Sequence, residues 1–493
     1  MKVAFFIFGS EPRHWNTGLE VALREFKYLK QLEIIWVAGG TPYIPFYSIN
    51  GLSRRSFHHK VPKYLEKIIS EIEANFPSIL VKVQVLEVNS NPEIKKHVQD
   101  FLRNASKLEN LNDLYPMMGA AVTNALMYET RDKWASFVTH EKLILLLCTS
   151  YVSTYETLVK FISKRNYNHV ILYNGRFIHE KALWAVTEAL GIDKTIFECL
   201  RDRYILFEFG PHERFSIQSR MKKIWNVALS DNRNLAIEIA SEYFESLNQS
   251  QVNRFIPKAI KPLEENFDFS FFTNSDDEAI GLGKDWVSPM GDNFQITNSV
   301  IKLFETGEYG TLAIKIHPNL SNKARAEQLV WNQLKGNNFI RIFDAQSKIS
   351  ALQLVANSKF VITTGSTVGA EAVYNLKPVA VLAPARYDQL GCTSNISSIE
   401  ELQKWCGSVY KFGVSMQKLM QNQVKILALG YWMAVSGTKH QLLETKLGPD
   451  GGFASKRFLG VSNDYPIISK IADRLVWYAY FFKIRLRLRI WKR

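Results

Sequence analysis

The stretch VITTGSTVGAEAVY, Val361–Tyr374, passes from a strand pattern into a helix pattern through a glycine, a serine and a threonine. Apolar and β-branched residues run up to Thr364, and the spacing then becomes helical. Gly365 allows a tight turn, and Ser366 or Thr367 is predicted to cap the helix. The first amides of a helix have no internal partner and lie at the positive end of its dipole, so this turn suits a phosphate. The stretch predicts one strand–turn–helix unit of a doubly wound α/β domain.

The same stretch supplies candidate ligand-binding side chains. The Ser366 and Thr367 hydroxyls can donate to phosphate oxygens, and Gly369 is expected to let the ligand approach closely. Glu371, about one turn further on, is placed to accept hydrogen bonds from ribose hydroxyls. The alternative is an ordinary Ser/Thr cap with no ligand, in which Glu371 is a first-turn carboxylate favoured by the dipole.

A second motif ends another predicted strand. In AIKIHPN, Pro318 stops the strand and leaves His317 at its carboxyl end, followed by Asn319. Lys315 is expected to face the same way as His317. One strand–helix–strand passage separates this motif from Ser366, so both are predicted at the same sheet edge. A histidine there suits a phosphate leaving group by supplying charge or a proton, although a lone strand-end histidine is often structural.

Strand-like and helical segments alternate along most of the chain, which predicts an α/β fold with two Rossmann-like, doubly wound domains facing across a cleft. The expected divisions are an N-terminal domain, a Pro-containing linker, a C-terminal domain and a final helical segment, at residues 1–255, 256–266, 267–425 and 426–493. Ligands of open parallel sheets bind beyond the carboxyl ends of the strands.

The composition of the chain limits the classes of binding partner that we expect. The 493 residues carry a formal net charge of +14, with 46% hydrophobic and 22% charged residues, as in a folded protein. A basic chain favours phosphorylated substrates or an anionic membrane surface, and no nucleic-acid-binding signature is present. The four cysteines lie far apart without a CxxC pair, so neither a zinc site nor a disulfide framework is expected.

The two ends of the sequence predict where the protein is located. The opening MKVAFFIFGS has an apolar run too short for a secretory signal and is predicted to be a buried strand. We expect a cytoplasmic protein, at the inner face of the cytoplasmic membrane. The tail Asp473–Arg493 joins aromatic to basic residues and is predicted to lie on an anionic bilayer. The alternative is a helix packed on the N-terminal domain.

The motifs FFTNSDDEA, GKDW, KIHPN and TTGSTVGAEAVYNLKPVAVL, with a tyrosine at 387, resemble the C-terminal half of bacterial capsule polysaccharide biosynthesis glycosyltransferases. That family is similar to the two-Rossmann-domain (GT-B) glycosyltransferases, including those that transfer sialic acid and Kdo. The resemblance implies a GT-B fold. It also implies transfer of a sugar from a nucleotide-activated donor to a growing surface polysaccharide or a lipid-linked glycan.

The resemblance also implies residue roles. His317, Ser366 and Thr367 would contact the donor's nucleotide phosphate, and Glu371 its ribose or base. Ser275 would approach the donor, although a capping box with the glutamate three residues on is the preferred interpretation. The full donor-binding prediction comprises Lys315, Asn319, Thr364, Gly365, Ser366, Thr367, Gly369, Glu371 and Ser275.

Neither a metal nor a cofactor is expected beside the nucleotide-sugar. Asp276 and Asp277 are adjacent rather than spaced as in the DxD motif of metal-dependent glycosyltransferases. The leaving group would be neutralised by the helix dipole, hydroxyls and His317. A catalytic base for an inverting reaction would come from the N-terminal domain, where we favour Arg176 and Glu208.

Three other functions remain open: a sugar-nucleotide epimerase of the same fold, a phosphotransferase using a CDP-activated polyol, and a non-catalytic glycan-binding subunit. An epimerase would need further acid–base residues around the sugar. The donor nucleotide, the sugar, the acceptor and the stereochemistry are likewise open.

Overall fold

The computed structural model describes residues 1–8, 12–38, 54–88, 91–105, 107–200, 202–207, 210, 213–249, 263–447 and 453–462. They form two units. Unit 1 comprises residues 1–129, 136–211 and 437–493, and unit 2 comprises residues 130–135 and 212–436.

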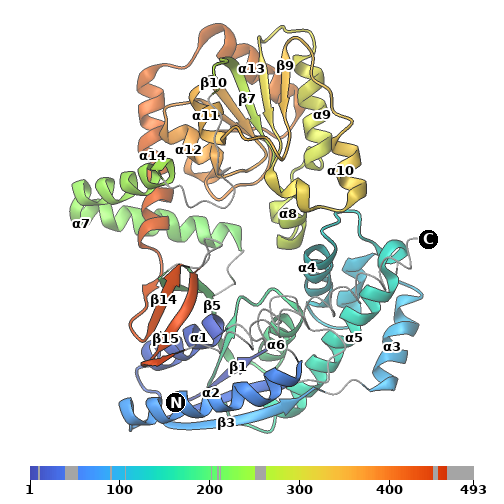
Figure 1. The fold of residues 1–493 in the computed structure, drawn as a ribbon, viewed down its shortest axis with the longest axis vertical. Coiled ribbons are helices and arrows are strands. Elements are labelled where there is room, and N and C mark those ends of the chain that lie inside the picture. The colour runs from blue at the N-terminus through green and yellow to red at the C-terminus, as the bar shows by residue number, and fades with distance from the viewer. Residues whose placement is uncertain are drawn as a thin grey trace. The chain divides into compact units, whose positions relative to one another are not determined.

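Unit 1 is built on a seven-stranded sheet in the order β13-β6-β5-β4-β1-β2-β3 (Figure 1). β3, β2, β1, β4 and β5 are parallel, whereas β6 runs antiparallel to β5 and β13 antiparallel to β6. The strands are β1 (Lys2–Ile7), β2 (Gln31–Ala38), β3 (Leu80–Glu87), β4 (His169–Tyr173), β5 (Asp193–Cys199), β6 (Arg203–Phe207) and β13 (Thr438–Lys439).

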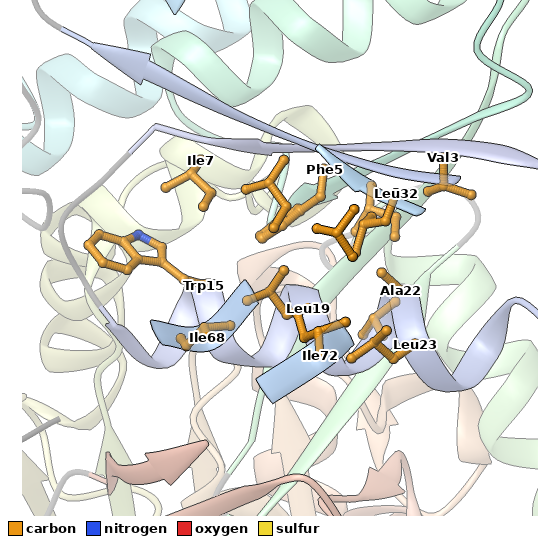
Figure 2. Packing of buried hydrophobic residues seen from close by; sticks show 14 of the residues in the cluster. Val3, Phe5, Ile7, Trp15, Leu19, Ala22, Leu23, Leu32, Ile68 and Ile72 are labelled. Atoms are coloured by element: carbon orange, nitrogen blue, oxygen red, sulfur yellow. The ribbon is translucent and has the colours of Figure 1, made fainter. Parts of the chain in front are cut away.

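Helices cover both faces of this sheet. They are α1 (Pro12–Glu25), α2 (Arg54–Asn75), α3 (Pro92–Leu102), α4 (Met118–Thr130), α5 (Phe137–Ile162) and α6 (Ile178–Ala189). On one face, Trp15 and Leu19 of α1 and Ile68 of α2 pack with Phe5 of β1 (Figure 2). On the other face, α5 and α6 pack on the alternate strand residues. β1 is apolar on both sides because it is buried between two helical layers.

After Ser436 the chain returns to unit 1. β13 pairs with β6, and a small antiparallel sheet of β14 (Leu443–Leu447), β15 (Phe453–Phe458) and β16 (Val461–Ser462) follows. Leu443 and Phe458 are buried in the same apolar cluster as α1.

Unit 2 contains a six-stranded, fully parallel sheet in the order β12-β11-β10-β7-β8-β9. Its strands are β7 (Phe267–Phe272), β8 (Leu312–Lys315), β9 (Ile340–Phe343), β10 (Ser358–Thr363), β11 (Val379–Val381) and β12 (Ser394–Asn395). Its helices are α7 (Arg214–Gln249), α8 (Asp276–Leu282), α9 (Asn293–Phe304), α10 (Arg325–Trp331), α11 (Ala351–Ala356), α12 (Val368–Tyr374), α13 (Ile399–Phe412) and α14 (Met416–Val435). α9 and α13 contribute to its main core, and α14 packs against α12 and α7.

The predicted class, two Rossmann-like doubly wound α/β domains, is confirmed by these two sheets. The unit boundaries differ from the expected divisions. α7 packs along α14 and so joins unit 2, and the segment 130–135 also belongs to unit 2. The predicted linker at 256–266 lies mostly outside the described residues, as does the tail 473–493. Within the described residues, no helix is both long and apolar enough to cross a membrane.

Candidate functional site

The carboxyl edge of the unit 2 sheet joins residues from three neighbouring parallel strands. β7 lies between β8 and β10. Just after β7, the Thr273 hydroxyl accepts a hydrogen bond from the His317 amide at 2.9 Å. The next residue, Asn274, donates its amide to the Thr364 hydroxyl at 2.8 Å. Thr273 and Asn274 therefore tie the strand end that carries His317 to the strand end that carries Thr364.

Sequence reasoning placed His317 and the Gly-Ser-Thr turn at one sheet edge, and the parallel register agrees. It missed Thr273 and Asn274. A signal was present, because these are the first polar residues after the apolar run of β7.

Gly365 forms the tight turn after β10, as predicted. Its φ is +87°, and a side chain there would overlap the carbonyl oxygen of Pro384. The Ser366 amide donates back to the Thr363 hydroxyl at 3.0 Å, which closes the turn. Only glycine meets both the backbone angle and the close approach.

The start of α12 departs from the predicted cap. Thr367 holds the N-cap position, but its side chain makes no capping bond; instead, the Val368 amide donates to the Ser366 hydroxyl oxygen at 3.4 Å. The Gly369 amide donates to the Ser366 carbonyl oxygen at 3.1 Å. These amides already have acceptors, so an anion here would rely mainly on the two hydroxyls. Thr367 is exposed, and its hydroxyl has no hydrogen bond to any described residue.

His317 is held in one tautomer. Its Nδ1 accepts a hydrogen bond from the Asn319 amide at 3.2 Å, so the proton of the neutral ring is on Nε2. Burial, reinforced by the nearby Lys323 ammonium, lowers the pKa of His317 to about 4. At neutral pH the ring is therefore uncharged and offers a hydrogen-bond donor. Of the two roles predicted, charge or a proton, the charge is absent in this state.

Lys315 and Ser275 have partners of their own. The Lys315 ammonium donates to the carbonyl oxygens of Asp344 at 3.0 Å and Ser347 at 3.2 Å, in the loop after β9. Burial lowers the pKa of Lys315 to about 8. The Ser275 hydroxyl donates to Asp277 Oδ1 at 2.7 Å and makes no capping bond to α8. The predicted capping box is therefore wrong, because Asp277 takes the hydroxyl.

Glu371 and Gly369 lie on the first turns of α12. In the described part of the chain, the Glu371 carboxyl forms no hydrogen bond or ion pair, and burial raises its pKa to about 7. Gly369 faces the Tyr387 hydroxyl, which a side chain at 369 would overlap. That hydroxyl donates to the Ser366 carbonyl oxygen at 2.5 Å. Gly369 thus makes room for Tyr387, whereas we had expected it to make room for a ligand.

A buried ionic cluster, defined by Asp276, Asp277, Lys133 and Lys323, lies at the start of α8. Asp277 pairs with Lys323, and Asp276 pairs with Lys133 at 2.9 Å. Burial alone would raise the pKa of Asp277, but the charge and hydrogen bond of Lys323, the Ser275 hydroxyl and the charge of Arg131 lower it overall. Sequence reasoning missed this cluster, because Lys133 lies far away in the sequence, in the segment that joins unit 2.

In unit 1, the two predicted catalytic residues have different outcomes. The Arg176 guanidinium donates from Nε to Asn124 Oδ1 at 2.7 Å and lies over the Phe177 ring. Glu208 lies outside the described residues.

A different carboxylate lies at the carboxyl edge of the unit 1 sheet. Glu198, at the end of β5, accepts hydrogen bonds from the Tyr173 hydroxyl at 3.0 Å and the Cys199 amide at 3.1 Å. Its other oxygen contacts the Asn174 side-chain nitrogen. Burial raises the pKa of Glu198, while part of the residue stays accessible to solvent. Sequence reasoning missed Glu198, although an acidic residue inside the apolar strand TIFEC was a visible signal.

Two buried polar atoms in the segment after β4 lack a hydrogen-bond partner among the described residues. Asn174 is buried with a φ of +53°, and its Oδ1 has no hydrogen-bond partner among the described residues. The same holds for Nδ1 of the buried His179, whose pKa burial lowers to about 4. The His14 ring stacks on Tyr173 with 3.7 Å between centroids. A small cavity at this edge is lined by Phe5, Phe6, Ile7, Phe8, His14, Trp15, Tyr173 and Glu180.

No group of three or more histidine, cysteine or acidic side chains is arranged to hold a metal ion within the described ranges. Metal independence of the reaction stays a prediction. The cysteines Cys148, Cys199, Cys392 and Cys406 are all free thiols.

Residues 221–424 match the family described as Capsule polysaccharide biosynthesis protein. The match covers most of unit 2, including β7 to β12 and the motifs around His317 and Ser366. The resemblance read from the sequence is therefore confirmed over this range. No curated protein matches the chain in sequence.

Several solved structures match this chain at low sequence identity. A beta-Kdo 2,4 transferase, KpsC of Thermosulfurimonas dismutans, is 11% identical over 63% of this chain and 87% of its own, with a TM-score of 0.34. A beta-Kdo 2,7 transferase of the same organism's KpsC is 13% identical over 65% and 88%, with a TM-score of 0.32. The UDP-GlcNAc 2-epimerase of Neisseria meningitidis is 12% identical over 87% and 96%, with a TM-score of 0.29.

Proposed function

We propose that this chain, whose residues 221–424 match the capsule polysaccharide biosynthesis family, is a glycosyltransferase. It would move a sugar from a nucleotide-activated donor to a growing capsular polysaccharide or a lipid-linked glycan. The observation that carries the proposal is the hydrogen-bonded junction of three strand ends in unit 2. There, Thr273 and Asn274 connect the loop of His317 with the turn of Thr364.

The donor's phosphate would be bound by neutral donors. The His317 Nε2–H and the hydroxyls of Ser366 and Thr367 would donate to phosphate oxygens and stabilise the charge that develops on the leaving nucleotide. The tautomer of His317 supports this role, since the Asn319 amide occupies the other ring nitrogen. Glu371, which has no side-chain partner among the residues that the structure describes, would accept hydrogen bonds from ribose hydroxyls.

For an inverting reaction, in which the base is expected from the N-terminal domain, Glu198 of unit 1 is the residue that would take the proton of the acceptor hydroxyl. In this step the hydroxyl oxygen bonds to the anomeric carbon, and its proton passes to the Glu198 carboxylate. The bond from the anomeric carbon to the phosphate oxygen breaks, and the nucleotide leaves with the electron pair. A raised pKa makes Glu198 a stronger base than an exposed glutamate, and Tyr173 and Asn174 fix its orientation.

The test is to incubate the protein with CMP-, UDP-, GDP- and CDP-activated donors, with and without a glycan acceptor. We expect one nucleotide to raise the melting temperature, because a ligand that binds only the folded state stabilises it. Release of that nucleotide should require the acceptor. Isomerisation of the donor without acceptor would instead identify an epimerase, and turnover of a CDP-polyol a phosphotransferase. Glycan binding without any turnover would identify a binding subunit.

His317→Ala should abolish the nucleotide-dependent rise in melting temperature, with His97→Ala, at an exposed histidine of α3, as the matched control. If neither substitution alters nucleotide binding, the assignment of the donor site to this sheet edge is wrong.

A further inference from the structure

The turn between α13 and α14 exposes large apolar side chains to solvent. Phe412 ends α13 and is 76% exposed, and Met416 and Met420 on α14 are 59% and 55% exposed. Val424 continues the series, so Met416, Met420 and Val424 are spaced four residues apart and share one face of the helix. Leu419 and Ile426 are buried on the opposite side of α14. The helix is thus apolar on its packed side and also carries an apolar stripe on its outer side.

Apart from Glu400 and Glu401 in the first turn of α13, the charged side chains of the same hairpin are basic. From Leu402 to Leu443 the sequence contains no aspartate or glutamate. Four exposed lysines occur at intervals of seven residues, namely Lys404, Lys411, Lys418 and Lys425. None of them forms an ion pair within the ranges that the structure describes; Lys425 donates to the Gly391 carbonyl oxygen at 2.9 Å. Lys404 lies near Glu400 and Glu401, whereas Lys411 and Lys418, beside the turn, have no carboxylate within the hairpin sequence.

The carboxylate of Asp268, near Tyr410 of α13, is paired with a lysine. Tyr410, 43% exposed on α13, lies close to the site of Gly310 and Asp268. The Asp268 carboxylate pairs with the exposed Lys359 at 2.8 Å. This pair leaves no net negative charge beside Tyr410.

We propose that the face formed by Phe412, Met416, Met420, Val424, Lys411 and Lys418 docks unit 2 onto an anionic lipid surface. The apolar side chains would enter the interface between head groups and acyl chains, and the lysines would approach the anionic head groups. A second copy of this chain is a poor occupant, because it would bring the same positive charge. The surface is distinct from the tail Asp473–Arg493, and its lipid binding does not depend on the donor site.

The experiment measures co-sedimentation of the full-length protein with vesicles of equal parts phosphatidylglycerol and phosphatidylcholine, and with phosphatidylcholine alone. We expect binding only to the anionic vesicles, weakening as salt is raised. Lys411→Glu with Lys418→Glu should lower the binding constant by about tenfold or more, since each lysine near an anionic surface contributes about 1 kcal/mol. Phe412→Ser with Met416→Gln should also lower it, without changing the melting temperature, because both side chains are exposed.

Two further variants make the outcome decisive. Leu329→Gln with Lys335→Glu changes exposed residues of the same kinds elsewhere in unit 2 and should leave binding intact. Replacing the basic residues between Lys483 and Arg493 by glutamine tests the tail separately.

The proposal is overturned if the face variants bind vesicles like the unaltered chain, if only the tail variant loses binding, or if the Leu329 control loses binding equally. It is also overturned if the face variants change self-association in the absence of lipid. The nucleotide-dependent rise in melting temperature should be the same in all of these variants. A failure of the lipid-binding proposal can therefore be told apart from a failure of the proposed glycosyltransferase function.

Discussion

His317 links the geometry of the donor site to the pH dependence of folding. Its pKa falls from 6.5 to about 4 on folding, because burial disfavours the charged ring. The unfolded chain therefore binds the proton more tightly. The stabilising contribution of neutral His317 is complete above pH 6.5 and is lost as the pH falls towards 4. Buried His14 and His179, also with lowered pKa values, add to the same loss.

We expect His317→Gln to reduce the fall in melting temperature between pH 6.5 and pH 4. The measurement is thermal unfolding across this range. His97→Gln, at an exposed position on α3, is the control and should keep the full slope. An unchanged slope in His317→Gln would contradict the assignment of a neutral, buried ring at 317.

The hydroxyls of Ser366 and Thr367 are predicted to bind the nucleotide phosphate. Removing one hydrogen bond to a charged group typically costs about 1.5–3 kcal/mol, so each alanine variant should weaken nucleotide binding by roughly tenfold or more. Calorimetric titration with the nucleotide that stabilises the protein measures this effect. Ser408→Ala, at an exposed serine of α13, is the control. Equal affinity in all three variants would show that the phosphate binds elsewhere.

Glu198→Gln keeps the shape of the side chain and removes the base. We expect kcat to fall by about a hundredfold or more while nucleotide binding is unchanged. In the unaltered protein, kcat/KM should fall as the pH is lowered, with its midpoint above pH 4.5 because burial raises the pKa of Glu198. Glu109→Gln, at an exposed glutamate of unit 1, should retain full activity. Full activity in Glu198→Gln would assign the base to another residue.

Individual site residues were predictable from sequence where local backbone chemistry dictates them. Gly365 at a positive φ and His317 before a proline are both visible in a short motif. Asn274 and Glu198 were missed because their importance comes from partners on other strands, which a linear sequence does not display.

At the scale of elements, the β10–α12 turn is supported by the loop that contains Tyr387. Asp388, in the 3₁₀ turn Asp388–Leu390, accepts hydrogen bonds from Gln218 of α7 at 2.8 Å and from the Ala385 amide at 3.0 Å. These hydrogen bonds fix the loop that carries Tyr387. The Tyr387 hydroxyl in turn donates to the Ser366 carbonyl oxygen. α7 therefore supports the β10–α12 turn indirectly, through Asp388 and then Tyr387.

A double-mutant cycle tests this arrangement. Gly369→Ala should destabilise the protein by about 1–3 kcal/mol, because the new methyl overlaps the Tyr387 hydroxyl. Tyr387→Phe alone should cost about 1 kcal/mol for the lost hydrogen bond. In the double variant the two costs should be less than additive, since the overlapping hydroxyl is gone. Urea unfolding provides the free energies, and strict additivity would show that 369 and 387 are not in contact.

Hydrophobic periodicity in the sequence predicted which segments are strands and which are helices. It did not predict which helices pack together in one unit. The predicted opening strand is β1, Lys2–Ile7, and the helix predicted after the Gly-Ser-Thr turn is α12, Val368–Tyr374. α7 was assigned to the N-terminal domain because it precedes the predicted linker, yet its apolar side packs on α14. Long-range packing of this kind has no signature within a single helix.

At the scale of the whole molecule, the chain leaves unit 1 and returns to it after Ser436. Glu20 of α1 binds the returning segment at residues 440–442. This fully buried carboxylate accepts hydrogen bonds from the amides of Gln441 at 2.5 Å and Leu442 at 3.1 Å. It also pairs with His440 at 2.8 Å. Although burial raises the pKa of Glu20, its hydrogen bonds with His440 and these amides lower the pKa overall. The stabilisation is therefore present above pH 4.5 and is lost as the pH falls.

Glu20→Gln should loosen the returning segment without unfolding unit 2. A neutral amide accepts these hydrogen bonds more weakly than a carboxylate, and half of its polar atoms are donors that would face the amides of residues 441 and 442. We expect faster hydrogen exchange across Thr438–Leu447, with the nucleotide-dependent rise in melting temperature retained because the donor site lies in unit 2. Glu73→Gln, at an exposed position on α2, is the control and should exchange like the unaltered protein. If Glu20→Gln leaves exchange at 438–447 unchanged, apolar contacts such as those of Leu443 and Phe458 hold the segment. If it abolishes nucleotide binding as well, the two units do not fold independently.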